Sequence, residues 1–181
     1  HEHLDHCDPE TLTKLLEYSP NVKFVGPSSV WRILSKLGVD SDRFLFSNCE
    51  SWIDLGNGVK IISTIAAHPE IQKDSKGNHC FVGFIISFNE INIYYSGDTC
   101  LIDEVLEDVK SKGPIHAAFI PVNERNYLRE KEGIIGNMGV RDALHFTSTL
   151  GVKFFVPMHY DMFQPNSVHE SEIEIVHQNS Y

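Results

Sequence analysis

The opening segment His1-Glu2-His3-Leu4-Asp5-His6 constrains this chain more than any other stretch of its sequence. It places three imidazoles and a carboxylate together, a mixture of nitrogen and oxygen donors that suits borderline cations such as Zn²⁺, Mn²⁺ and Fe²⁺. In an extended or tight-turn loop, His1 and His3 project to the same side and can share one metal ion, while Asp5 and His6 face a second position. The alternative is a solvated histidine-rich terminus such as a tag remnant. A tag has consecutive histidines without an ordered acid, so we favour the metal site.

Three more polar residues stand at or just after the ends of predicted strands, namely His68, Asp98 and His159. Strand ends commonly deliver functional side chains to one edge of a sheet, so these residues are candidate partners of the opening segment. Each has a structural alternative. Asp98 could be a turn residue, and His159 could be a hydrogen-bonded core histidine. His79 competes with His68, which we favour because it directly ends a strand.

The predicted elements alternate between extended and helical patterns and indicate an α/β fold. The strongest local signals are Asp8 before Pro9, which marks a helix start, and Asn57-Gly58, which marks a hairpin. Helices are predicted at 9–16, from 28 or 29 to 37, and at 101–110, 138–150 and 168–176, and strands at 22–25, 51–55, 59–66, 81–88, 91–96, 115–121 and 152–156.

Composition bounds the function further. The chain has 181 residues, which predicts one domain over 1–181, and a formal net charge of -10, which opposes binding to nucleic acid or to an anionic membrane. No run approaches the roughly 20 apolar residues that a membrane span needs. The four cysteines lie far apart, as expected of reduced thiols in the cytoplasm. We therefore expect a small-molecule substrate. The sequence does not fix the oligomeric state, and a homo-oligomer is one possibility.

Four motifs, in this order along the chain, resemble those of the metallo-β-lactamase superfamily. They are His-x-His-x-Asp-His at 1–6, Ala66-Ala67-His68-Pro69, Tyr95-Ser96-Gly97-Asp98-Thr99 and Pro157-Met158-His159-Tyr160. The resemblance covers essentially the whole chain and lacks only the N-terminal strands of the superfamily. It implies a four-layer αβ/βα sandwich, here a single domain that is incomplete at its N-terminus.

The resemblance also implies a ligand set for two divalent metal ions, manganese or zinc. One ion would be held by His1, His3 and His68, and the other by Asp5, His6 and His159, with Asp98 bridging both. Such a pair holds a hydroxide between the ions and polarises an attacked oxygen. The implied catalytic residues are Asp5, Asp98 and His159.

The segments 120–129, 136–138 and 158–163 resemble the L-ascorbate-6-phosphate lactonase branch of that superfamily, a branch associated with manganese. This implies a metal-dependent hydrolase that opens a phosphorylated sugar lactone. The candidate substrate-binding residues are Asn123, Arg125, Tyr127, Arg129, Asn137 and Tyr160. The two arginines would hold the phosphate, and Tyr160 would help to stabilise the oxyanion. Alternatively, the arginines pair with neighbouring glutamates.

Two other functions remain open at this stage. A phosphodiesterase or phospholipase would use the same two metals, and a metal-bound scaffold would keep the fold without turnover. The intact ligand set argues against the scaffold.

Overall fold

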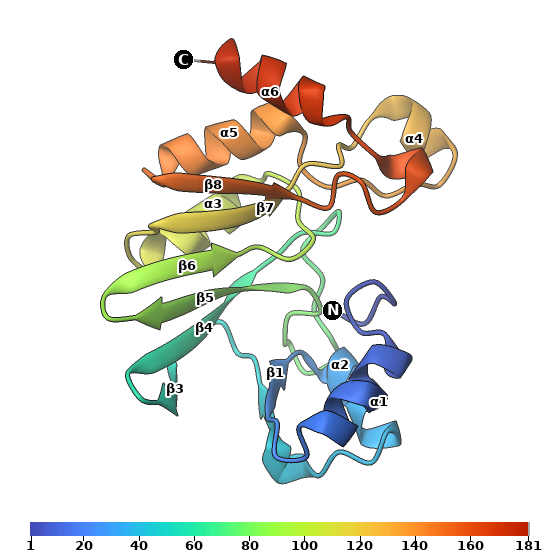
Figure 1. Cartoon of the computed structure of the whole chain (residues 1–181), viewed down its shortest axis with the longest axis vertical. Helices are drawn as coiled ribbons and strands as arrows, with labels where there is room; N and C mark the ends of the chain where they lie inside the picture. The colour runs from blue at the N-terminus through green and yellow to red at the C-terminus, as the bar shows by residue number, and fades with distance from the viewer. Residues whose placement is uncertain (181) are drawn as a thin grey trace.

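The computed structural model describes residues 1–180 and consists of a mixed six-stranded sheet, a two-stranded sheet and surrounding helices (Figure 1). The strands are β1 Phe24–Gly26, β2 Phe44–Phe46, β3 Ile53–Gly56, β4 Val59–Ile65, β5 Val82–Phe88, β6 Ile91–Tyr95, β7 Ala117–Pro121 and β8 Phe154–Met158. The helices are α1 Pro9–Tyr18, α2 Ser28–Lys36, α3 Asp103–Ser111, α4 Tyr127–Lys131, α5 Val140–Thr149 and α6 Glu170–Gln178, with short 3₁₀ turns at Ser41–Arg43 and Gln164–Asn166.

The large sheet runs in the order β3-β4-β5-β6-β7-β8. Strands β3 to β6 are antiparallel neighbours, whereas β6, β7 and β8 are parallel. Consequently β4, β6, β7 and β8 all end at the same edge. The arrowheads of β6, β7 and β8 point to this edge in Figure 1, and the N-terminus lies beside it. The topology therefore gathers the loops that follow these strands.

Helices α3 and α5 cover one face of the sheet, and α6 packs against α5. Their apolar residues meet alternate residues of the strands, such as Ile85 on β5, Tyr94 on β6 and Ile120 on β7, which are all fully buried. This alternation follows from the period of two in a strand, which sends successive side chains to opposite faces.

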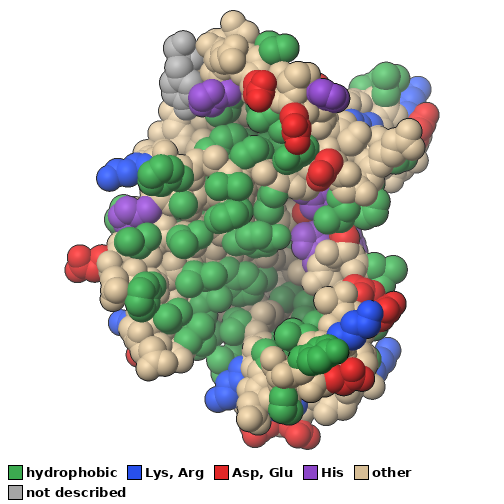
Figure 2. All heavy atoms as spheres, in the orientation of Figure 1, with side chains coloured by type: hydrophobic (Ala, Val, Ile, Leu, Met, Phe, Trp, Pro, Cys, Tyr) green, Lys and Arg blue, Asp and Glu red, His purple; other side chains and the backbone are tan. Residues whose placement is uncertain are grey.

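The opposite face of the sheet carries apolar side chains that remain exposed. Figure 2 shows them as a broad hydrophobic patch over the strands. Its members on β5, β6 and β8 are Ile86, Phe88, Ile91, Ile93, Tyr95, Phe154 and Val156. The described residues thus supply one helix layer and one large sheet layer of the expected four-layer sandwich. Among the described residues, no helix has the length and apolarity to cross a membrane.

A smaller unit formed by α1, α2, β1 and β2 lies at the lower end of Figure 1. Its own core contains Leu34, Val39 and Phe44. The Asp8 carboxylate caps α1 by accepting from the backbone N–H of Thr11 at 2.7 Å, as Asp8 before Pro9 predicts.

The structure confirms every predicted helix and strand, with ends shifted by a few residues. The hairpin at Asn57-Gly58 joins β3 to β4, and both residues have the positive φ angles that such a turn requires. Four short elements were not predicted, namely β2, α4 and the two 3₁₀ turns. Strand β2 has only three residues and is held by parallel pairing with β1, about 20 positions earlier in the sequence. The alternation of apolar residues within so short a segment is too weak to predict a strand.

Candidate metal centre

Four loops bring the histidine and aspartate residues together. The first is the opening segment, which folds into a tight turn because the N–H groups of His6 and Cys7 both donate to the His3 carbonyl, at 3.0 and 2.8 Å. The others follow β4, β6 and β8 and carry His68, Asp98 and His159. All seven residues predicted as metal ligands therefore meet at one edge of the sheet, although they are separated by up to 158 positions in the sequence.

The seven side chains form two sets. His1, His3 and His68 make one, and Asp5, His6, Asp98 and His159 make the other. Within each set, the ligand atoms lie within 4.8 Å of one another. These are nitrogen and oxygen donors only, which suit zinc, manganese or ferrous iron.

Asp98 lies between the two sets with one carboxylate oxygen toward each. Its Oδ2 is 3.9 Å from His1 Nε2 and 3.7 Å from His68 Nε2. Its Oδ1 is 3.2 Å from His6 Nε2 and 3.4 Å from His159 Nε2. A carboxylate in this position can serve both sets at once, which is the bridging arrangement that the superfamily resemblance implies.

Several of these atoms are buried without a hydrogen-bonding partner, namely His1 Nε2, His6 Nε2 and Asp98 Oδ1. Such groups are costly in a folded protein unless a ligand satisfies them. A divalent cation in each donor set would satisfy them, because His1 belongs to one set and His6 and Asp98 to the other, so the residues present fit a metal centre.

The electrostatics favour the ligating protonation states of Asp98 and His68. Burial opposes the ionisation of Asp98, but His6, His159 and His68 around it outweigh that effect and lower its pKa. Burial is also the main reason that the pKa of His68 is lowered. Carboxylate and neutral imidazole are the forms that bind metal ions.

Asn137 holds His68 in place. The buried Asn137 Oδ1 lies 2.9 Å from His68 Nδ1, so the ring donates there and its Nε2 faces Asp98. The prediction placed Asn137 against the substrate, whereas the structure places it behind a candidate ligand, as in many metal sites. His79, the competitor of His68, instead forms a β-bridge with Lys73 and is outside both sets.

A cavity of about 460 Å³ opens over this centre. Five of its lining residues belong to the metal centre and are called its floor below, namely His3, Asp5, His68, Asp98 and His159. The other lining residues are called its walls, namely Asn123, Gly133, Ile134, Ile135, Phe163, Pro165 and Asn166. Asn123 follows β7 and was predicted from the sequence to bind substrate. The other wall residues were not predicted, because nothing in the local sequence distinguishes them from ordinary loop residues.

The two predicted phosphate-binding arginines are engaged elsewhere. Arg125 forms an ion pair with Glu130. Arg129 donates to the backbone carbonyls of Asn123, Glu124 and Ser167, the last at 2.6 Å. Neither arginine lines the cavity. The alternative of pairing with neighbouring glutamates describes both arginines, because Arg129 Nη1 also lies 4.0 Å from Glu124 Oε2. The hydrogen bonds of Arg129 to carbonyl groups in addition connect the loop after β7 with the loop before α6.

The two predicted tyrosines also lie outside the cavity lining. Tyr127 begins α4, is 66% exposed, and has Lys131 Nζ 5.1 Å from the centre of its ring. Tyr160 packs against the main core, and its carbonyl accepts from Val168 N–H at 2.8 Å. The contribution of Tyr160 to oxyanion stabilisation therefore gains no support from its position.

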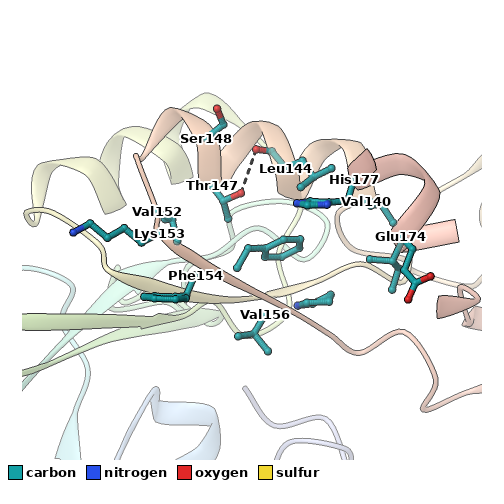
Figure 3. Close-up of a pocket in the computed structure, with 13 residues that line it drawn as sticks. Val140, Leu144, Thr147, Ser148, Val152, Lys153, Phe154, Val156, Glu174 and His177 are labelled. Carbon is teal, nitrogen blue, oxygen red and sulfur yellow. Dashed lines mark hydrogen bonds between the residues drawn. The ribbon is translucent and has the colours of Figure 1, made fainter. Parts of the chain in front are cut away.

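Another cavity, of about 510 Å³, lies between α5, α6 and β8 (Figure 3). The Thr147 hydroxyl in its wall donates to the carbonyl of Leu144 within the same helix. None of its lining residues is among the buried polar groups without a partner in the described part of the chain. Unsatisfied donors and acceptors, rather than size, single out the cavity over the metal centre.

Comparison with known proteins identifies the family of the chain. The family model described as "Beta-lactamase superfamily domain" matches residues 1–160. The chain therefore belongs to the beta-lactamase superfamily. A curated relative, a UPF0173 metal-dependent hydrolase from Pyrobaculum islandicum, is 28% identical over 164 residues, which is 90% of this chain and 64% of the relative. The chain thus spans somewhat less than two thirds of that relative's length.

Solved structures show the same fold. Igni18, a metallo hydrolase from Ignicoccus hospitalis, superimposes with a TM-score of 0.74 at 22% identity, covering 99% of this chain and 70% of that one. An isothiocyanate hydrolase from Delia radicum gut bacteria gives a TM-score of 0.72 at 16% identity, covering 99% and 67%. The chain therefore has the metallo-β-lactamase fold, an α/β arrangement with a mixed sheet.

Proposed function

We propose that this protein is a metal-dependent hydrolase with two divalent metal ions, and that its substrate is a lactone. The observation that carries the proposal is the position of Asp98, whose two carboxylate oxygens face two separate sets of histidine and aspartate donors. His1, His3 and His68 would hold one ion, Asp5, His6 and His159 the other, and Asp98 both.

When bound, divalent cations at such a site lower the pKa of water and polarise a carbonyl oxygen. The surrounding residues hold the lactone in the cavity with its carbonyl toward the floor. Asp5 Oδ2, 3.2 Å from His159 Nε2, lies in that floor and is placed to take a proton from the attacking water. Water then adds OH to the carbonyl carbon, the bond to the ring oxygen breaks, and the proton passes to that oxygen. The product is a hydroxy acid.

The resemblance to the lactonase branch makes L-ascorbate-6-phosphate the first lactone to assay, with manganese and with zinc. Metal content would be measured by mass spectrometry on the same samples. We expect ring opening of a lactone, phosphorylated or not, that disappears with EDTA and returns with the metal. Turnover of bis(p-nitrophenyl) phosphate but of no lactone would replace this proposal with a phosphodiesterase. Bound metal without turnover of either class would favour a scaffold.

We also propose that the protein acts in the cytoplasm. Its four cysteines, Cys7, Cys49, Cys80 and Cys100, are all free thiols, and reduced thiols persist in that compartment.

A further inference from the structure

The cavity over the metal centre has no fixed positive charge in its walls. Among the described residues, none that lines it is a lysine or an arginine. The two nearby arginines have other partners, Glu130 for Arg125 and three backbone carbonyls for Arg129. A phosphate on the part of the substrate that lies along these walls would lose water without gaining an ion pair. The formal net charge of -10 opposes it further.

Two carboxamides in the wall lack partners instead. Asn123 is 1% exposed and Asn166 is 8% exposed, both line the cavity, and the Oδ1 atom of each is buried without a hydrogen-bonding partner. Leaving such an acceptor unpaired costs about 1–3 kcal/mol. The pair therefore indicates a ligand that brings its own donors.

Hydroxyl groups meet this requirement best, because a hydroxyl both donates and accepts and so can satisfy either end of a carboxamide. The remaining wall is apolar, with Ile134, Ile135, Phe163 and Pro165. Ile135 and Phe163 are about half exposed, at 49% and 47%. Their exposed apolar surface can be covered by the C–H groups on one face of a lactone ring.

We infer that this site takes an uncharged, hydroxylated lactone, with Asn123 and Asn166 as the residues that recognise its hydroxyl groups. The inference rests on the proposed lactonase function and restricts its class of substrates, because it excludes a phosphorylated sugar lactone as the preferred substrate. Asn123 and Asn166 reach the site from different segments, after β7 and within the 3₁₀ turn after β8, so each can be tested separately.

The test uses lactams, which resist hydrolysis, so that binding is measured apart from turnover. D-glucono-1,5-lactam, its 6-phosphate and the unsubstituted δ-valerolactam are titrated by calorimetry into the metal-loaded protein. We expect the neutral hydroxylated lactam to bind at least about tenfold more tightly than its 6-phosphate. Asn123→Leu and Asn166→Leu should each weaken its binding about five- to tenfold, a typical cost for a lost hydrogen bond. Both should leave δ-valerolactam within about twofold.

Asn179→Leu is the matched control, since Asn179 is exposed beyond α6 and donates only to the carbonyl of Ile175. Tighter or equal binding of the 6-phosphate overturns the inference, as do Asn→Leu variants that bind both neutral lactams like the wild type. If one variant does not fold, the inference is tested by the other variant and by the preference of the wild-type protein for the neutral lactam over its 6-phosphate. Opening of D-glucono-1,5-lactone is assayed separately. The expected binding pattern without ring opening would remove the proposed lactonase activity but keep Asn123 and Asn166 as residues that bind the hydroxyl groups of an uncharged ligand.

Discussion

The metal centre and the adjacent segment 124–132 are both rich in ionisable residues, but they differ in whether their polar atoms have hydrogen-bonding partners within the protein. In the metal centre, His1 Nε2, His6 Nε2 and Asp98 Oδ1 are buried without hydrogen-bonding partners. In segment 124–132, Arg125 pairs with Glu130, and Arg129 donates to carbonyl groups. Buried polar atoms left unsatisfied by the protein indicate a ligand, whereas satisfied ones indicate a structural role. Charge and proximity to the site do not by themselves make a residue functional.

The strongest test of this contrast is Asp98→Ala. Because Asp98 faces both donor sets, we expect the variant to lose both metal ions, with affinity falling by more than about 100-fold, beyond the effect of removing an outer partner of a ligand. Metal content after dialysis, measured by mass spectrometry, reports the result. Asp161→Ala, at an exposed position two residues after His159, is the control and should keep its metal. Full metal content in Asp98→Ala would remove the site assignment.

Asn137→Leu should have the next largest effect. It removes the acceptor for His68 Nδ1 but keeps all seven candidate ligands, so we expect metal affinity to fall about 10- to 100-fold. Competition with a chelating dye measures this change. Asn137→Asp restores an acceptor and should recover most of the affinity. Equal affinities for the Leu and Asp variants would show that the hydrogen bond does not position the ring.

Arg129→Gln tests the structural side of the comparison. The variant loses charged hydrogen bonds to the loops at 123–124 and 167, and we expect about 2–3 kcal/mol less stability in chemical denaturation. Metal affinity should stay unchanged. If instead phosphate-bearing ligands bound much more weakly and stability did not change, Arg129 would belong with the substrate.

Arg125→Gln should have the smallest effect. Its ion pair with Glu130 is nearly half exposed on both sides, and such pairs contribute about 0–1 kcal/mol. The same denaturation series serves as the measurement, with Arg129→Gln as the matched comparison. A loss as large as that of Arg129→Gln would contradict the ranking.

Much of the fold was predictable because its signals are local. The cap at Asp8, the turn at Asn57-Gly58 and the apolar alternation of the strands each depend on residues a few positions apart, and each element formed where expected. The positions of histidine and aspartate after strand ends also predicted that the candidate ligands meet at one sheet edge, and the structure brings them together there.

The substrate-facing wall was not predictable in the same way. Asn123, Arg125 and Arg129 look equally suitable for binding in the sequence, yet only Asn123 lines the cavity. Asn166 gave no signal, because Gln164-Pro165-Asn166 reads as an ordinary turn.

The sequence by itself therefore determined the elements, the chemical types of the candidate ligands and the strand ends that carry them, because backbone propensity and donor chemistry are properties of neighbouring residues. Only the tertiary structure decided which polar atoms find a partner within the protein. Hydrogen bonds such as those from Arg129 to Ser167 and from His68 to Asn137 join residues 38 and 69 positions apart. Whether a polar side chain is available for a ligand depends on such long-range partners, which exist only once the chain has folded.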